Sequence, residues 1–225
     1  MSGNRWMALL GGVALAVVTV ACGGREKQVV DQYFNAVKAE DTQTLSSFAA
    51  VQFEKKADRW SIVQVSPETK APATLPDMVQ KVADTEKAIA DNKKAASAYA
   101  LENLNAWEQV QEARRKDAPV PAKLQKTAED YDNFAAKDRD LKKTLAEAKD
   151  AVEAEKRDAR LSVGDLPDIE TLKGEVTTKE IELLLTIGGQ QLPYMMQLKK
   201  YDLGQDGGQG RVVSRWMVHD LKPKN

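Results

Sequence analysis

The chain has few residues of the kinds that build metal, disulfide or catalytic sites. Its 225 residues include one cysteine and one histidine, and aromatic residues make up 6%. A single cysteine excludes an intramolecular disulfide, and together with one histidine it cannot form a His/Cys metal cluster. The formal net charge is −1, from 33 basic and 34 acidic residues, which gives no electrostatic support for a nucleic-acid partner. We therefore expect no metal, no other cofactor and no nucleic acid.

The one long apolar run lies at the start of the chain and ends close to the only cysteine. Residues 7–20 carry no charge, and Arg5 is the only charged residue before them. As a helix this run spans roughly 21 Å, short of the roughly 30 Å hydrocarbon core of a membrane. A basic start followed by a short apolar run is typical of an export signal and not of a permanent membrane span.

The residues Thr19, Val20, Ala21 and Cys22, followed by two glycines, resemble the lipobox of bacterial lipoproteins. The resemblance implies that residues 1–21 are a signal peptide, that Cys22 carries a diacylglyceryl group, and that its amino group is acylated, for example with palmitate. It implies a lipid-anchored protein of the bacterial cell envelope that faces the periplasm or the exterior. Two or three acyl chains anchor a protein stably. The alternative is an ordinary cleaved signal peptide or a short anchor with an incidental cysteine.

The middle of the chain predicts two long helices. Residues 77–116 and 121–161 contain no glycine and consist largely of good helix formers. Proline cannot continue a helix, so the sequence DAPVP at 117–121 ends the first and lets the second begin. Seven-residue repeats run along both segments and favour packing against a partner helix. Because the connection is short, we expect residues 76–161 to form an antiparallel two-helix coiled coil.

The predicted seam between these helices is partly polar, with Asn92, Asn103, Asp138 and Glu155 at core positions. Such residues either set the register of a solvated arm or mark where a third helix, from a protein partner or a second copy, completes the seam. Apolar side chains gather near the predicted tip, and aromatic residues are enriched where proteins bind. The expected partner contacts, which should face one another across the seam, are Leu104, Trp107, Tyr131 and Phe134.

The segments on either side of the hairpin predict a small α+β domain. Residues 29–37 carry apolar side chains at helical spacing, Asp41 can cap a second short helix, and residues 59–66 alternate as a strand. After the hairpin, further strands separated by glycine-rich turns complete an antiparallel sheet of about four strands. The chain divides into a signal peptide, a first domain part, the hairpin and a second domain part at residues 1–21, 22–75, 76–161 and 162–225.

This order resembles the nuclear-transport-factor-like, cystatin-like α+β cone found in many small bacterial lipoproteins. The similar stretches are VVDQYFNAVKAEDTQTLSSF at residues 29–48 and the closing strands YMMQLKKYDL and GRVVSRWMVHDL. The helical hairpin stands where that family usually has a short helix and strands. The resemblance implies a cone-like base but no single function, because this fold serves isomerases, dehydratases, binding modules and structural domains alike.

The sequence offers little for catalysis. His219 is followed by Asp220 on the predicted last strand, and neighbours on a regular strand point to opposite faces, so we do not expect them to act as a pair. Aromatic residues on strands, such as Tyr201 and Trp216, are more often core than cavity lining.

We therefore expect a non-catalytic, membrane-anchored lipoprotein whose hairpin is an interaction arm for a protein partner or for self-association. One alternative is a small-molecule-binding or isomerase-like cone, which would have a cavity lined by Trp60, Tyr201 or Trp216. A periplasmic efflux adaptor is less favoured, because too few strands follow the hairpin.

Overall fold

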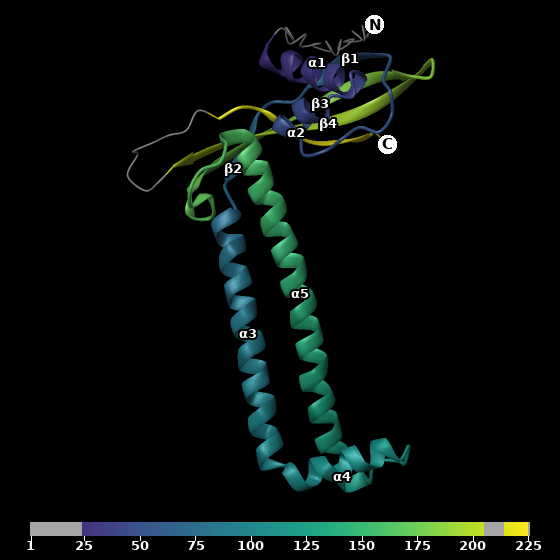
Figure 1. Ribbon diagram of the computed structural model, residues 1–225, viewed down its shortest axis with the longest axis vertical. Helices are drawn as coiled ribbons and strands as arrows, with labels where there is room; N and C mark the ends of the chain where they lie inside the picture. Colours follow the sequence, from purple (N-terminus) through teal and green to yellow (C-terminus); the bar gives the residue numbers. More distant parts are fainter. Residues whose placement is uncertain (1–23, 205–213, 225) are drawn as a thin grey trace, which may run out of the picture.

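The computed structural model describes residues 24–204 and 214–224; Cys22 and the predicted turn at 204–210, apart from Gly204, lie outside the described residues. The protein is α+β, as predicted, with a sheet domain from which a long helical arm projects (Figure 1). The helices are α1 (Arg25–Lys38), α2 (Thr42–Phe48), α3 (Leu75–Glu102), α4 (Leu104–Arg115) and α5 (Gln125–Val163), with 3-10 turns η1 (Ala122–Leu124) and η2 (Ile169–Thr171). The strands are β1 (Arg59–Val65), β2 (Thr69–Pro72), β3 (Lys173–Ile187), β4 (Gln190–Gly204) and β5 (Met217–Pro223).

The two helices before the sheet form where the apolar spacing predicts them. α1 turns Tyr33 and Phe34 inward, and both are at most 1% exposed. The Asp41 carboxylate caps α2 by accepting a hydrogen bond from the backbone N–H of Thr44 at 2.9 Å. This cap holds α2 against the end of α1, and both helices contribute to one apolar core with the sheet.

The sheet is antiparallel in the order β1-β3-β4-β5, and β2 pairs with β3. β3 and β4 are joined by Gly188 and Gly189, whose φ angles of 57° and 81° suit a two-residue hairpin turn. The sheet thus has five strands where about four are expected. β2 escapes prediction because all four of its residues are exposed and it ends in Pro72, so it has no alternating apolar pattern.

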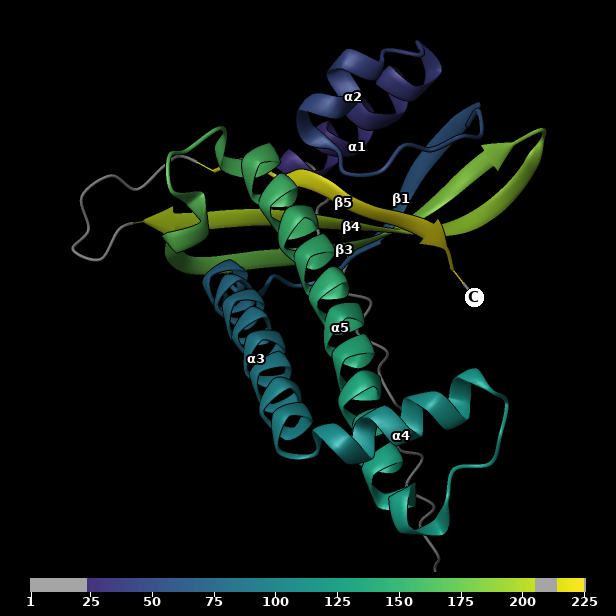
Figure 2. The ribbon, with the colours of Figure 1, turned by 60° about the horizontal axis from the view of Figure 1, so that its bottom comes forward.

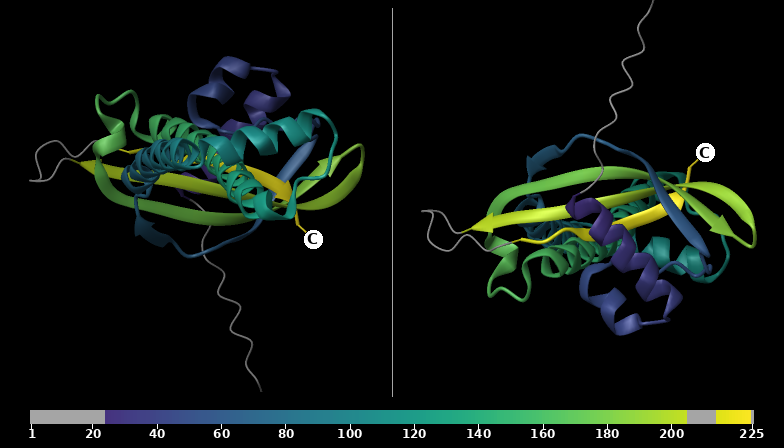
Figure 3. Two further views of the ribbon diagram at one scale, coloured as in Figure 1. Left: turned by 90° about the horizontal axis from the view of Figure 1, so that it is seen from below. Right: turned by 90° about the horizontal axis from the view of Figure 1, so that it is seen from above.

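Both faces of the sheet are covered. Alternation along β4 places Met196 and Leu198 on the face that packs against α1 and α2, whereas Tyr201 and Leu203 point to the other face. That second face packs against the sheet-proximal ends of α3 and α5. The sheet therefore lies between α1 and the arm (Figure 1), and the end-on view of Figure 3 shows α1 lying across the strands.

The arm is an antiparallel pair of helices, as predicted. With 28 and 39 residues, α3 and α5 are about 42 and 58 Å long. Seam residues of both helices are buried, among them Ile89 and Val152 at 8% exposure. α5 runs further than α3 at the sheet end, where Asp158 and Ser162 are also buried.

The prediction of one continuous helix over residues 77–116 is wrong, because the helix breaks at Asn103. Asn103 has φ −114° and ψ 25°, and its side-chain amide donates to the carbonyl of Tyr99 at 3.0 Å. Asparagine side chains compete with helical hydrogen bonds in this way. Asn103 is therefore a joint and not a seam residue, and α4 turns across the distal end of the arm (Figure 2).

Candidate functional site

α4 covers one side of α5 at the distal end of the arm. Trp107 stacks on Tyr131 with ring centroids 3.4 Å apart and planes 14° apart. Tyr131 also meets Tyr99 edge-on, and Val110, which is fully buried, packs with Ala128. These contacts make the tip a small three-helix unit on this side.

The structure brings together three of the four residues predicted to contact a partner. Trp107 and Tyr131 contact each other and Phe134 contacts Tyr99, so these aromatic side chains are half-buried within the arm. Leu104 does not join them: it is 49% exposed, because the break at Asn103 redirects the chain. The large apolar side chains that are exposed within residues 24–204 and 214–224 are Val63, Leu101 and Leu104. Two of them flank the α3–α4 joint.

The other side of the arm carries an open groove of about 700 Å³ between α3 and α5. Ala128 marks the side of α5 that α4 contacts. Lys137 lies on the α5 wall of the groove, nine positions or two and a half helical turns after Ala128. The groove is thus on the side of α5 opposite to the α4 contact. Its lining residues are Ala88, Asp91, Asn92, Ala95 and Tyr99 on α3, and Asp130, Asn133, Phe134 and Lys137 on α5.

Asn92 is the unusual residue of this groove. It is 5% exposed, and its Nδ2 donates to the carbonyl of Phe134 at 3.1 Å. Its Oδ1 is buried and has no hydrogen-bond partner among the described residues. A buried polar atom without a partner destabilises a fold by about 1–3 kcal/mol. Because this oxygen is enclosed within the arm, it weakens the contact between α3 and α5 but is not exposed in the groove.

The distal end of the groove holds a tyrosine–carboxylate pair. The hydroxyl of Tyr99 donates to Asp130 at 2.7 Å. This hydrogen bond raises the pKa of Tyr99, and with Lys126 it lowers the pKa of Asp130. Both groups therefore keep their ordinary charge states near neutral pH, and the carboxylate keeps a negative charge on the α5 wall.

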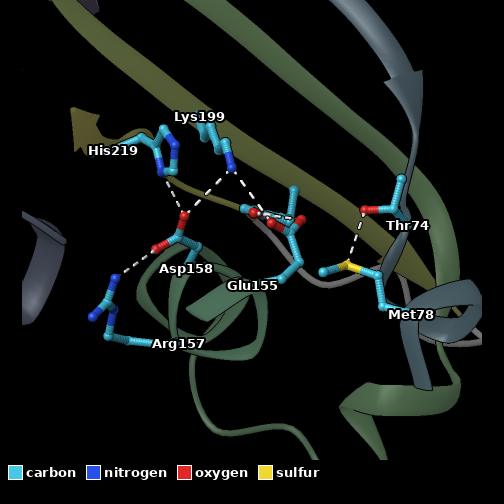
Figure 4. A network of polar contacts seen from close by, with 8 residues as sticks. Thr74, Met78, Glu155, Arg157, Asp158, Lys199 and His219 are labelled. Carbon is cyan, nitrogen blue, oxygen red and sulfur yellow. Dashed lines mark hydrogen bonds and ion pairs between the residues drawn. The ribbon is translucent and has the colours of Figure 1, made fainter. Parts of the chain in front are cut away.

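A second polar cluster lies where the arm joins the sheet (Figure 4). Nδ1 of His219 on β5 donates to Oδ2 of Asp158 on α5 at 2.5 Å, and Nζ of Lys199 is 3.4 Å from the same oxygen. Burial raises the pKa of Asp158, which is 2% exposed, but the hydrogen bond and charge of His219 and the charge of Lys199 outweigh it. The pKa of Asp158 therefore lies below its ordinary value of 3.8.

Sequence patterns do not predict the pairing of His219 with Asp158. As predicted, His219 and Asp220 do not pair with each other: Asp220 pairs with Lys222. The β4–β5 register steps from Gln197 opposite Asp220 to Leu198 opposite Val218, which leaves His219 as the extra residue of a β-bulge. A bulge re-aims a side chain, so the strict alternation assumed from sequence does not apply here. Asp158 is 61 positions away, and only the packing of α5 on the sheet brings it to His219.

The same cluster fastens α5 to β4. The hydroxyl of Tyr201 donates to Glu155 at 2.8 Å, and Oγ of Ser162 accepts from the backbone N–H of Tyr201 at 3.0 Å. Burial, with the nearby carboxylate of Glu155, raises the pKa of Tyr201 far above its ordinary range. A carboxylate that orients an imidazole is also a common proton-transfer arrangement, and the His219 side chain is 32% exposed. Ion-pair networks that only support structure have the same appearance.

The aromatic residues proposed for a ligand cavity are packed in two separate cores. Trp60 stacks on Phe34 with centroids 5.2 Å apart, and Trp216 belongs to the same core. Tyr201 belongs to the core on the opposite face of the sheet. These three side chains therefore do not line one shared cavity.

Within residues 24–204 and 214–224, no group of three or more His, Cys, Asp or Glu side chains is placed to hold a metal ion. Over the same residues, no helix combines the length and hydropathy that crossing a membrane requires. No protein-family model matches the chain, and no curated protein or solved structure matches it significantly. The groove and the His219–Asp158 cluster are the features that bear on function.

Proposed function

We propose that this protein is a non-catalytic bacterial envelope lipoprotein, anchored to a membrane through Cys22, whose arm is an interaction element. The observation that carries the proposal is the placement of the arm. It leaves the sheet on the face opposite α1 (Figure 1), and its distal part carries an open groove and two exposed leucines. An open groove with polar and apolar lining beside exposed apolar side chains is the kind of surface at which proteins bind.

The position of the anchor supports this placement. Arg25, the first residue of α1, follows Cys22 by three positions, which reach no more than about 11 Å. A lipid on Cys22 would hold the sheet domain close to the membrane surface. The groove residue Lys137 lies 21 positions from Asp158 along α5, or about 32 Å from the sheet end of the arm. The groove would then face the aqueous space of the envelope, where protein partners are found.

The anchor can be tested directly. Mass spectrometry of the N-terminal peptide from membrane fractions should show a diacylglyceryl group on Cys22. The Cys22→Ser variant should be released from the membrane or remain unprocessed. An unmodified Cys22 thiol in the membrane-bound wild-type protein would refute the anchor.

The role of the arm is tested by shortening it. Residues 93–133 can be replaced by a short Asn-Gly loop at the level where Asn92 meets Phe134. The sheet domain should stay folded, because neither of its two apolar cores contains a residue from this segment. We expect the shortened protein to reach the membrane but to lose its protein contacts and its cellular role. Retention of both by a folded, shortened protein would refute the proposal.

The His219–Asp158 cluster favours a second candidate function, an isomerase-like or ligand-binding sheet domain that uses His219 as a proton acceptor. This candidate requires that Asp158→Asn abolish the cellular role in a folded protein while shortening the arm does not. The two proposals thus predict opposite results for the same pair of variants.

A further inference from the structure

The groove lies on the side of the α3–α5 pair that α4 leaves uncovered. From Ala88 to Tyr99 it follows α3 for three helical turns, about 17 Å. Ala88 and Ala95 leave room for another helix to approach closely, whereas on the opposite side of α5 the Trp107 ring fills the equivalent space. The groove therefore has the dimensions of a helix contact that is missing from the single chain.

The two walls of the groove carry opposite charges at one level of the arm. Asn92 contacts the carbonyl of Phe134, which aligns the two helices. Asp91 lies one residue closer to the sheet than Asn92, and Lys137 lies three residues closer to the sheet than Phe134. At 1.5 Å per residue, their positions along the arm axis differ by about 3 Å. Asp91 is acidic and stands on α3, whereas Lys137 is basic and stands on α5.

Among the described residues, neither Asp91 nor Lys137 pairs with a group on the opposite wall of the groove. Asp91 pairs with Lys87 on its own helix at 2.6 Å, and the two side chains are 63% and 75% exposed. The side chain of Lys137 makes no hydrogen bond or ion pair with any other residue that the structure describes. Both charges are available to a molecule that enters the groove.

We propose that the occupant is the same groove of a second copy, so that two arms form a parallel four-helix bundle. The inference rests on the proposed anchoring and interaction role, because two chains held in one membrane present their arms side by side. A two-fold axis along the arms places α3 of each copy opposite α5 of the other. Asp91 of each copy then meets Lys137 of its neighbour, and the two ion pairs form together.

The oligomeric state of the full chain in detergent tests the inference by sedimentation and mass photometry. We expect the wild-type chain to be dimeric, and Asp91→Lys to weaken the dimer at least tenfold because it places two lysines opposite each other twice. The double variant Asp91→Lys with Lys137→Asp should restore the dimer. Asp150→Lys is the matched control: it makes the same charge reversal on an exposed part of α5 outside the groove.

A steric pair tests the geometry without changing charge. Ala95→Trp fills the groove and should abolish the dimer, whereas Ala90→Trp, on the exposed opposite side of α3, should leave it intact. In intact cells, chains with Asp91→Cys should crosslink to co-expressed chains with Lys137→Cys. A monomeric wild-type chain without these crosslinks overturns self-association, and equal dimerisation of all variants overturns the groove as the contact between copies. If shortening the arm still removes a protein contact in that case, the proposed role of the arm stands and only the occupant is wrong.

Discussion

The sheet domain and the arm reach stability in different ways. In the sheet domain, large side chains such as Tyr33, Leu183 and Met196 are fully buried, and helices cover both faces of the sheet. Among the described residues, the arm helices instead bury polar atoms without a hydrogen-bond partner. Asn92 Oδ1 and the Tyr131 hydroxyl lie in the distal arm beside the open groove, and Asp158 Oδ1 lies where α5 meets the sheet. The sheet domain is thus well packed by its own helices, whereas the arm keeps an open surface between its two helices.

Ion pairs along the arm helices do not compensate for these unsatisfied polar atoms. The lysine of each i,i+4 pair is exposed, and such pairs contribute only about 0.3–0.5 kcal/mol each. They include Lys87–Asp91, Lys116–Glu112, Lys126–Asp130 and Lys142–Asp138. Helix propensity and the partly apolar seam therefore carry most of the stability of the arm.

The largest contrast is expected from matched aromatic truncations. Phe34→Ala should lower the free energy of unfolding by about 3–5 kcal/mol, because Phe34 is 1% exposed and contacts three other aromatic rings. Phe134→Ala in the arm should lower it by less than half as much, since Phe134 is only half-buried. Urea unfolding followed by tryptophan fluorescence and by helical circular dichroism measures both. Equal losses would show that the arm is packed as tightly as the core of the sheet domain.

A second variant pair probes the junction between the two regions. His219→Ala should destabilise the fold by about 1–3 kcal/mol, because it removes a hydrogen bond from the buried Asp158 carboxylate. Asp220→Ala should change stability by less than about 0.5 kcal/mol, since its ion pair with Lys222 is exposed. Chemical denaturation of both variants is the measurement. A larger effect from Asp220 would contradict the bulged register.

The pH dependence of stability also tests the role of Asp158 at the junction of α5 with the sheet. The pKa of Asp158 is lower in the folded protein than its ordinary value of 3.8, so the ionised carboxylate stabilises the fold above about pH 4. That stabilisation is lost as the pH falls below about 4 and through the folded-state pKa. Thermal melts of Asp158→Asn should therefore show a flatter decline over this acidic range than wild type. Parallel curves would assign the acid sensitivity to other carboxylates.

The smallest effect, and the one of opposite sign, is expected in the seam of the arm. Asn92→Leu removes the unpartnered Oδ1 and adds apolar surface, but it also removes the Nδ2 hydrogen bond to Phe134. These effects oppose one another, so the variant should be neutral or stabilise α3 by up to about 1 kcal/mol. Hydrogen exchange of α3 amides measures this locally. A clear destabilisation would mean that Asn92 is satisfied within the single chain.

Much of the fold follows from local patterns in the sequence. Helical spacing and the Asp41 cap predict α1 and α2, alternation predicts β1, and glycine-free segments with heptads predict the arm. The break at Asn103 was not predicted, because heptad counting assigns any residue at that spacing to the seam. In the structure, the hydrogen bond from the Asn103 side chain to the Tyr99 carbonyl accompanies the end of the helix.

The candidate sites depend more on tertiary structure. The aromatic contact of Trp107 with Tyr131 follows from apolar clustering in both helices, but the groove depends on where α4 turns after the break. The pairing of His219 with Asp158 needs both the β-bulge and the packing of α5 over β4 and β5. Local sequence patterns do not predict a contact between residues 61 positions apart.

We expect the arm, and not the sheet domain, to contact other proteins. Photo-crosslinking in intact cells from Ala95 in the groove, Leu101 at the α3–α4 joint and Val63 on the sheet edge measures this directly. Leu101 and Val63 are matched, since both are exposed apolar residues at 77% and 57%. The account predicts an adduct of twice the chain mass from Ala95, one defined protein adduct from Leu101 and none from Val63. Adducts from Val63 alone would contradict it.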